Sequence, residues 1–398
     1  MKHDHYITRK GEIYVFDFFM PNVNFFGRGS VSVTGERCQL LGAKKALIVT
    51  DEFLKNMKGG PVEKVTASLD DAGIGYVIFT EVEPNPKDTN VASGLAMFEQ
   101  EQCDLILTVG GGSAHDCGKG IGIAATHDGD IYENYAGIET LSNPLPPIVC
   151  VNTTAGTASE VTRHCVLTNT KKKIKFVVVS WRNTPLVSIN DPELMVGKPP
   201  ALTAATGMDA LTHAVESYVS LGANPVTDAH AIQAIKLISD NLRQAVAYGG
   251  NLEARENMAH ASLLAGMAFN NAGLGYVHAM AHQLGGLYDI PHGVANAVLL
   301  PHVENFNMIS NPEKFADIAR FMGENTDGLS VRAAADKAVQ AIRTLSEDVN
   351  IPSSMRELGV KEEDIDLMAE LAMKDGNAFS NPIQGTKEDI VSIFKNAY

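Results

Sequence analysis

The sequence predicts an α/β fold in its first half and an all-helical fold in its second half. Up to about residue 195, short continuous apolar runs alternate with stretches of helical periodicity, the pattern of parallel strands covered by helices on both faces. Beyond Pro199-Pro200, β-rich runs are few and long helical periods rich in Ala, Leu, Met and Glu dominate. We therefore expect an α/β domain over residues 1–195 and an all-α domain over residues 196–398.

Individual elements can be assigned in order. In the first half, the expected buried strands are 45–50, 75–79, 104–109 and 147–151, with helices over 61–72 and 91–100 between them. In the second half, amphipathic spacing predicts helices over 227–241, 252–268, 311–322, 331–349 and 361–373.

Composition restricts the class of protein. Hydrophobic residues make up 45% of the 398 residues, so the chain can bury a large core, and the net charge of -15 argues against nucleic-acid or anionic-membrane partners. No apolar stretch reaches the length of a transmembrane helix, and the polar N-terminus lacks the apolar core of a secretory signal. Five cysteines, an odd number without a C-x-x-C pair, indicate reduced thiols. We expect a soluble, cytoplasmic protein.

A glycine-rich turn predicts a nucleotide site. Gly110–Ser113 follows an expected strand and opens a helix, so that backbone N–H groups can face a pyrophosphate. The Thr-rich turn 153–157 follows another strand, and ligands of open α/β sheets bind at these carboxyl ends. Asp51, at the end of an earlier strand, is placed to bind a ribose hydroxyl and to repel a 2′-phosphate, which favours NAD over NADP.

These residues also have structural interpretations. The spacing departs from G-x-G-x-x-G, because His115 occupies the third glycine position and Asp51 precedes the glycines. A tight strand-to-helix turn without a ligand is therefore an alternative, as is a helix N-cap role for Asp51. The run 157–160, Thr-Ala-Ser-Glu, fits a capping box.

A histidine cluster predicts a metal site. Asp209 and His213 are four residues apart, His278 and His282 repeat this spacing, and His292 follows Pro291. One carboxylate and three imidazoles would bind Fe2+ or Zn2+. Four ligands are needed and five candidates exist, so one of the five remains for chemistry, and spacing does not decide which. The remaining histidines considered are interpreted as structural: His115, His164, His230, His260 and His302.

Two other classes of function compete with a dehydrogenase. A metal-dependent hydrolase would use the same Asp/His site to activate water, but it leaves the glycine turn and Asp51 unexplained. A catalytically silent nucleotide-binding or assembly protein would leave the histidines as core residues. The sequence contains no G-x-S-x-G elbow, no Walker lysine loop and no H-E-x-x-H.

Four segments together resemble the iron-containing (group III) alcohol dehydrogenases. They are GGGSAHDC at 110–117, TTAGTASEVT at 153–162, ATGMDALTH at 205–213 and GYVHAMAH at 275–282. The resemblance runs from about residue 14 to the C-terminus. It implies a two-domain, dehydroquinate-synthase-like fold in which NAD and the metal face each other across the interdomain cleft, and homodimers that assemble into a homodecamer.

The resemblance also implies roles for individual residues. The metal, typically Fe2+ with Zn2+ or another divalent ion as alternatives, would be bound by Asp209, His213, His278 and His292. His282 would then be the free histidine near the nicotinamide, a candidate for proton relay. The implied NAD contacts are Asp51, Asn85, Gly111, Gly112, Ser113, Asp116, Thr153, Thr154, Thr157, Val166 and Lys175.

The implied reaction is reversible hydride transfer between NAD(H) and a short primary alcohol or aldehyde. The stretches 21–27, 83–90, 152–169 and 374–382 resemble family members that act on 3-hydroxypropanal and 1,3-propanediol in glycerol fermentation, and this resemblance implies the same substrates here. The alternative is a broad primary alcohol dehydrogenase acting on ethanol, butanol, lactaldehyde or methanol. Two features depart from the family: its frequent Asn-Pro-Arg is Asn381-Pro382-Ile383 followed by Gln384, and the first dozen residues, expected to be a floppy extension, have no counterpart.

Overall fold

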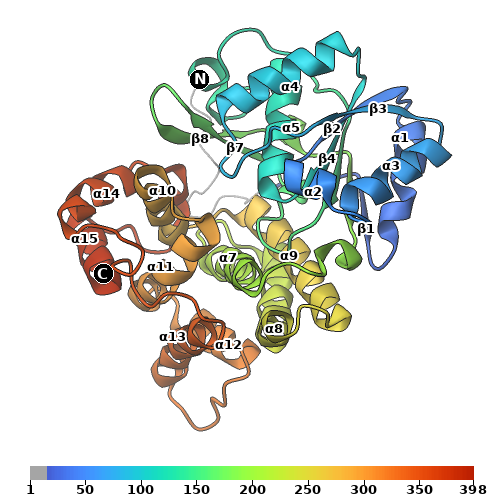
Figure 1. Cartoon of the computed structure of the whole chain (residues 1–398). Helices are drawn as coiled ribbons and strands as arrows, with labels where there is room; N and C mark the ends of the chain where they lie inside the picture. The colour runs from blue at the N-terminus through green and yellow to red at the C-terminus, as the bar shows by residue number, and fades with distance from the viewer. Residues whose placement is uncertain (1–15) are drawn as a thin grey trace.

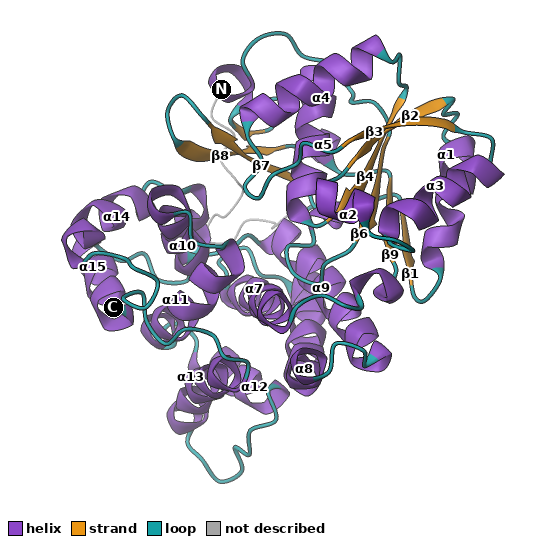
Figure 2. Cartoon of the chain, viewed as in Figure 1, coloured by secondary structure: helices purple, strands orange, loops and turns teal. Residues whose placement is uncertain are grey.

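The computed structural model describes residues 16–398, so the expected N-terminal extension lies outside the described residues. Its first half combines strands and helices, and its second half contains helices only (Figures 1 and 2). The predicted fold class is therefore confirmed. None of the described helices is long and apolar enough to cross a lipid bilayer.

A six-stranded parallel sheet forms the centre of the first half. Its strand order is β1-β9-β6-β4-β2-β3. The bounds are β1 Val23–Phe26, β2 Lys45–Val49, β3 Gly75–Phe79, β4 Leu105–Gly110, β6 Ile148–Asn152 and β9 Val187–Asn190. Because all pairs are parallel, the carboxyl ends of these strands meet at one edge of the sheet.

Helices cover both faces of this sheet. Alternate residues of β2 point to opposite faces: Ala46 and Ile48 pack in one buried cluster with α1 and α3, whereas Leu47 and Val49 pack in another with α4 and α5. Burial on both faces explains the continuous apolar runs in the sequence. The helices of this half are α1 Thr34–Leu40, α2 Glu52–Asn56, α3 Pro61–Asp71, α4 Asp88–Gln100, α5 Gly112–Ala124 and α6 Ile131–Tyr135.

A smaller sheet extends from the first half towards the helical half. Strands β7 (His164–Asn169) and β8 (Ile174–Val179) form an antiparallel hairpin, and β5 (Gly137–Ile138) pairs with β8 in parallel. The turn of the hairpin contains three consecutive lysines at 171–173, of which Lys173 has a left-handed φ of 55°. The hairpin carries two of the expected cofactor contacts, Val166 and Lys175.

The second half is a bundle around α7. Helix α7 (Pro200–Val219) is buried along most of its length and packs against α8, α9 and α11. The other bounds are α8 Pro225–Ala247, α9 Leu252–Ala272, α10 Tyr276–Tyr288, α11 His292–Asn307, α12 Pro312–Phe321, α13 Val331–Asp348, α14 Ile365–Ala372 and α15 Lys387–Ala397.

The N-terminal segment connects the two halves. The side chain of Asn270 on α9 donates to the carbonyl of Phe19 at 2.9 Å, and the backbone N–H of Phe19 donates to Asn271. The guanidinium of Arg163, which precedes β7, lies 4.4 Å from the centroid of the Phe19 ring. Segments far apart in the sequence therefore meet at Phe19.

The predicted strands β2, β3, β4 and β6 are confirmed to within one residue at each end. The sequence reading missed β1 and β9, which have only four residues each, and the β7–β8 hairpin. Strand β9 ends at Asn190 and α7 begins at Pro200, while the division into separate domains near residue 195 stays a prediction.

Candidate active site

The glycine turn and the threonine turn lie in direct contact at the carboxyl edge of the sheet. Strand β4 ends at Gly110 and α5 begins at Gly112. A Cβ atom at Gly111 would lie 2.8 Å from Thr154 Oγ1, and one at Gly112 would lie 2.7 Å from Thr157 Oγ1. Only glycine permits this approach, which places threonine hydroxyls beside the N–H groups at the start of α5. Such an arrangement can bind a phosphate group.

Asp51 is the N-cap of α2. Its Oδ1 accepts a hydrogen bond from the backbone N–H of Leu54 at 2.8 Å, so the structural interpretation of this residue is confirmed. Only Thr50 separates the residue from the end of β2, at the same sheet edge as the glycine turn. A cap that uses one carboxylate oxygen is compatible with a second role towards a ribose.

The capping box expected at 157–160 is wrong. The short 3-10 helix Ser159–Val161 has Ala158 as its N-cap, with a left-handed φ of 51° and no side-chain cap bond. Glu160 instead points into the interior, where burial raises its carboxyl pKa to about 7. Neither carboxylate oxygen of Glu160 has a hydrogen-bond partner among the described residues, so the reciprocal bond of a capping box is not formed.

A buried lysine that the sequence reading missed holds this segment in place. Lys119 on α5 is completely buried, and its ammonium donates to the carbonyls of Ser159, Thr162 and His164 at 2.7, 3.0 and 2.7 Å. Beside it, Ser159 donates to Asp116 Oδ1 at 2.7 Å. Asp116, an expected cofactor contact, is thereby fixed beneath the threonine turn, and burial raises its pKa.

Two further expected cofactor contacts reach the helical half. The ammonium of Lys175 donates to Asn85 Oδ1 at 2.7 Å, and the amide of Asn85 donates to Asp289 Oδ1 at 2.9 Å. Asp289 is the C-cap of α10, the helix that carries His278 and His282. Burial lowers the pKa of Lys175. This chain of hydrogen bonds links the first half to the histidine-bearing helices.

The structure brings four of the five metal-ligand candidates together. Asp209 and His213 lie one turn apart on α7, His278 lies on α10, and His292 is the first residue of α11. Each offers one oxygen or nitrogen atom, and these atoms all lie within 4.8 Å of one another. We call Asp209, His213, His278 and His292 the four-residue cluster. Close approach of α11 to α7 requires Gly293, since a Cβ there would lie 2.3 Å from the carbonyl oxygen of Ala205.

Burial sets the protonation of the four-residue cluster. It raises the pKa of Asp209 and lowers the pKa values of His213, His278 and His292. Mutual repulsion of the imidazoles adds to the lowering at His278 and His292. Neutral imidazoles carry the lone pairs that metals bind, so these donors fit a divalent ion with mixed O and N ligands.

Two polar residues that the sequence reading missed orient the cluster. Glu216 is hydrogen-bonded through Oε2 to His278 Nδ1, and its Oε1 accepts from the N–H of Val277 at 2.7 Å. Asn296 Nδ2 donates to Asp209 Oδ1 at 2.7 Å and lies 3.1 Å from the Nε2 atoms of His278 and His292. Metal ligands are commonly oriented in this way by outer-shell partners. Spacing was the available signal: each residue lies three or four positions after a ligand candidate on the same helix.

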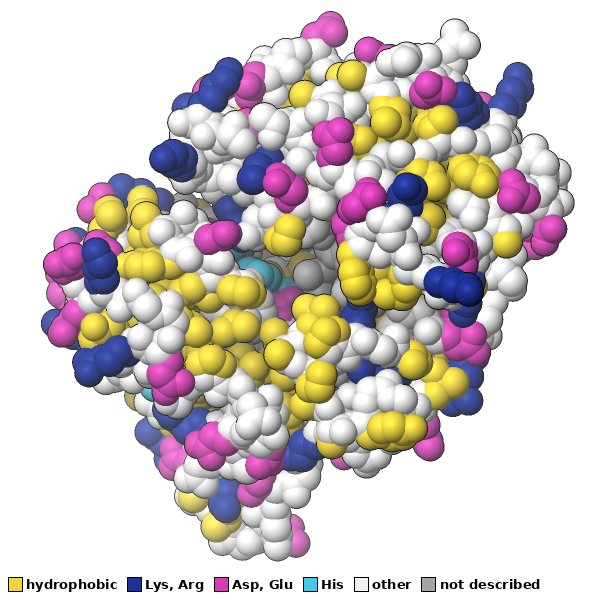
Figure 3. Space-filling view, viewed as in Figure 1, with side chains coloured by type: hydrophobic (Ala, Val, Ile, Leu, Met, Phe, Trp, Pro, Cys, Tyr) yellow, Lys and Arg dark blue, Asp and Glu magenta, His cyan; other side chains and the backbone are white. Residues whose placement is uncertain are grey.

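His282, the fifth candidate, lies at the rim of the cluster. Its Nδ1 is 2.7 Å from Asp375 Oδ2, and its ring stacks on His292 with centroids 5.6 Å apart. The side chain is 21% exposed, against 2% for His278. Figure 3 shows histidine surface at the floor of a hollow between the two halves of the molecule. Solvent reaches this position, as it also reaches His292, whose side chain is 27% exposed.

The histidines interpreted as structural lie outside the four-residue cluster. His115 Nδ1 is 2.7 Å from Thr108 Oγ1 inside the sheet layer, and His230 Nδ1 is 2.7 Å from the carbonyl of Val226. His260 and His164 pack against Phe26 and Phe269. Burial lowers the pKa of His302 to about 4.

The segment that departs from the family motif supports α10. Asn381 is completely buried, and its Oδ1 accepts from the N–H of Tyr276 at the start of α10 at 3.0 Å. Its Nδ2 donates to Asn307 Oδ1 and to the carbonyl of Ile383, both at 2.8 Å. Gln384 donates to the carbonyl of Asn381 at 2.9 Å. In this chain the loop is closed by Gln384 without an arginine.

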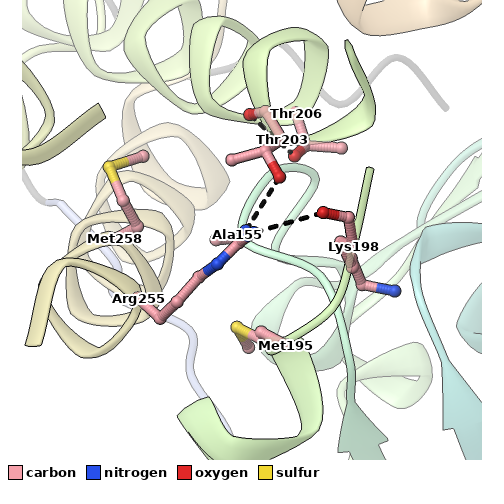
Figure 4. Close-up of a pocket in the computed structure, with 7 residues that line it drawn as sticks. All are labelled: Ala155, Met195, Lys198, Thr203, Thr206, Arg255 and Met258. Carbon is pink, nitrogen blue, oxygen red and sulfur yellow. Dashed lines mark hydrogen bonds between the residues drawn. The ribbon is translucent and has the colours of Figure 1, made fainter. Parts of the chain in front are cut away.

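A small cavity next to the threonine turn lies where the two halves pack against each other (Figure 4). Buried Arg255 on α9 donates to Thr203 Oγ1 at 2.8 Å and to the carbonyl of Lys198 at 3.3 Å. Figure 4 shows the Lys198 ammonium pointing away from the guanidinium and Ala155 of the threonine turn beside it. Arg255 therefore fixes the connection that leads from the sheet into α7.

Comparisons with known proteins identify the family of the chain. The iron-containing alcohol dehydrogenase model matches residues 21–192, and the model of the C-terminal part of the Fe-containing alcohol dehydrogenase family matches residues 203–398. The 1,3-propanediol dehydrogenases of Citrobacter freundii and Klebsiella pneumoniae are each 72% identical over 384 residues, which covers 96% of this chain and 99% of theirs. A crystal structure of 1,3-propanediol oxidoreductase superposes with a TM-score of 0.95 at 71% identity, covering 97% of this chain and all of that one. The chain belongs to the iron-containing alcohol dehydrogenase family.

Proposed function

We propose that this enzyme is an NAD-dependent, metal-dependent oxidoreductase that interconverts 3-hydroxypropanal and 1,3-propanediol. The observation that carries the reaction class is the four-residue cluster, which is joined to the nucleotide half through Lys175, Asn85 and Asp289. The substrate pair is supported by the near-full-length relatives named 1,3-propanediol dehydrogenase.

The proposed metal is Fe2+, bound by Asp209, His213, His278 and His292. Their donor set of one carboxylate and three neutral imidazoles suits a borderline divalent ion, and it would also accept Zn2+. Glu216 would hold the His278 ring with Nε2 facing the other ligands.

The proposed cofactor is NAD. Gly111, Gly112 and Ser113 would bind its pyrophosphate at the start of α5, with Thr153, Thr154 and Thr157 adding hydroxyl donors. Asp51 would bind the adenosine ribose and repel the extra phosphate of NADP. The remaining contacts would line the path to the helical half: Asn85, Asp116, Val166 and Lys175.

When bound, NADH would supply the hydride and the divalent metal would polarise the carbonyl oxygen of the aldehyde. The residues of the chain orient these reactants and move the proton. With His282 Nδ1 engaged by Asp375, Nε2 is the nitrogen that would accept the alcohol proton during oxidation; during reduction the imidazolium would return that proton to the nascent alcohol, directly or through water. Its partial exposure connects this position with solvent.

The proposed setting is the cytoplasm, with homodimers that assemble into a homodecamer. All five cysteines are free and buried, as in proteins of reducing compartments. Membrane or nucleic-acid partners are not proposed, since the net charge is -15.

An anaerobic assay of NADH oxidation with 3-hydroxypropanal tests the proposal. Protein stripped by a chelator should be inactive, and activity should return with Fe2+ and prefer NADH to NADPH. Failure of every divalent metal to restore turnover on any short aldehyde would contradict the metal role. A higher kcat/KM for ethanol than for 1,3-propanediol in the oxidation direction would favour the broad alcohol dehydrogenase instead.

A further inference from the structure

A carboxylate outside the four-residue cluster is hydrogen-bonded to the free histidine. Asp375 follows α14, and its Oδ2 lies 2.7 Å from Nδ1 of His282 on α10. The two side chains come from segments 93 residues apart, and both are largely shielded, with exposed fractions of 16% for Asp375 and 21% for His282. This contact links α10 to the segment that follows α14.

The other oxygen of Asp375 is held by its own turn. Oδ1 accepts from the backbone N–H of Asn377 at 2.9 Å and from its side-chain amide at 3.1 Å, so Asp375 caps the 3-10 helix Gly376–Ser380. Asn381, at the end of this 3-10 helix, connects it to α10, because its Oδ1 accepts from the N–H of Tyr276. The carboxylate is therefore locked relative to the helix that carries His282.

The charge state of the Asp375 carboxyl group matches this geometry. Burial acts to raise the pKa of Asp375, but the imidazole of His282 and the hydrogen bonds from His282 and Asn377 outweigh it, so the pKa is lowered. An ionised carboxylate accepts the Nδ1–H of a neutral imidazole, which leaves the lone pair on Nε2.

We infer that Asp375 is a positioning residue for the reaction: it fixes the tautomer and the ring orientation of His282, so that Nε2 faces the site where the alcohol proton is exchanged. This inference rests on the proposed function. No covalent step is involved; the carboxylate holds the imidazole while one proton moves between Nε2 and the substrate oxygen. The same division of labour between a carboxylate and an imidazole operates in hydrolase triads.

A double-mutant cycle tests the inference with Asp375→Asn, His282→Ala and the combined variant. We expect Asp375→Asn to lower kcat at least about tenfold, with less than a twofold change in the KM for NADH. In the His282→Ala background the same substitution should change kcat less than twofold, because Asp375 acts only through His282. Metal content should stay at the wild-type level in all three variants. The matched control is Asp366→Asn on α14, whose exposed carboxylate pairs with Lys387 at 2.7 Å.

An equal loss of kcat in both backgrounds, loss of metal in Asp375→Asn, or an unchanged kcat would overturn the inference. A second readout needs no turnover: the rate at which diethylpyrocarbonate modifies His282, followed by mass spectrometry. Asp375→Asn should slow modification of His282 several-fold and leave His230 unchanged, and an unchanged rate at His282 would also overturn the inference. Because this readout is independent of substrate, failure of the proposed function and failure of the Asp375 role remain distinguishable.

Discussion

The nucleotide half and the metal half of the site are built from opposite kinds of residue. The turns Gly110–Ser113 and 153–157 contain glycine, serine, alanine and threonine, so they contribute backbone N–H groups, hydroxyls and shape. The four-residue cluster contains only ionisable side chains, three of them almost completely buried. The first site depends on the absence of Cβ atoms, and the second depends on burying groups that water would otherwise solvate.

This difference determines how each half can be damaged. In the nucleotide half, one added methyl group can block binding. In the metal half, binding is lost when one metal-ligand side chain changes its charge. The two halves meet through Lys175, Asn85 and Asp289, and His213 of the cluster also interacts with the backbone of Gly156 in the threonine turn. The variants below test whether damage to one half leaves the other intact.

The largest expected effect is in the metal half. Asp209→Asn removes the one carboxylate of the four-residue cluster with almost no change in shape. We expect kcat to fall by about 10³, equivalent to about 4 kcal/mol, because a divalent ion supplies several kcal/mol of stabilisation to the transition state. Metal content after gel filtration should fall in parallel, while NADH binding persists. His230→Ala, outside the cluster, is the control, and a full metal content in Asp209→Asn would refute the role of Asp209.

The next effect tests the cost of burying ionisable groups in the helical half. Glu304 on α11 is completely buried, and burial raises its pKa to about 8 from the ordinary value of 4.5. The unfolded chain therefore loses this proton at lower pH than the folded chain, so stability declines as pH rises from about 4.5 towards 8. Between pH 5.5 and pH 8, Glu304→Gln should gain about 2–3 kcal/mol of stability relative to wild type in urea unfolding.

The matched control for this measurement is Glu347→Gln, an exposed glutamate on α13. Its stability should follow wild type at both pH values. If the difference between Glu304→Gln and wild type is the same at pH 5.5 and pH 8, the raised pKa of Glu304 is wrong.

A smaller effect is expected in the nucleotide half. In Gly112→Ala, the new Cβ would lie 2.7 Å from Thr157 Oγ1, so the two turns must separate. We expect the Kd for NADH to rise about 30-fold, or about 2 kcal/mol, with metal content unchanged. Gly122→Ala in the same helix is the control, because its Cβ would meet only Ile106, Ile148 and Leu145 at 3.4–3.6 Å. Loss of metal in Gly112→Ala would show that the halves are not independent.

The smallest effect concerns coenzyme choice. Asp51→Asn keeps an N-cap oxygen for Leu54 but removes the negative charge. The ratio of kcat/KM values for NADPH and NADH should rise about tenfold, or about 1.4 kcal/mol, with little change in thermal stability. Asp51→Ala should also lose about 1 kcal/mol of stability, because alanine cannot cap the helix. A ratio that does not move in Asp51→Asn would leave the cap as the role of Asp51.

The same contrast explains what could be predicted from the sequence. Strands buried on both faces leave long apolar runs, so β2, β4 and β6 were visible, whereas β1 and β9 have four residues each. Spacing of four residues identified Asp209 with His213, but the resemblance to a family was needed to separate His282 from the ligands. Glu216 and Asn296 lie at helical spacing after His213 and His292, but spacing alone does not distinguish a partner of a ligand from any other polar residue. The contact of Asp375 with His282 depends on which segments meet in space.

The pairing of β1 with β9 has a consequence for folding of the nascent chain during synthesis. Val23 lies opposite Val187, and β9 is the sole strand beside β1 among the described residues. At 5–20 residues per second, a ribosome needs roughly 10–30 s to make the intervening residues. Strands β2, β3, β4 and β6 are synthesised before β9 emerges. The central strands can therefore pair first, and β1 can pair only after β9 has been made. The hydrogen bonds of Phe19 form later still, because Asn270 and Asn271 on α9 are synthesised after the entire sheet. Residues 19–26 are thus among the last of the described residues to reach their final contacts.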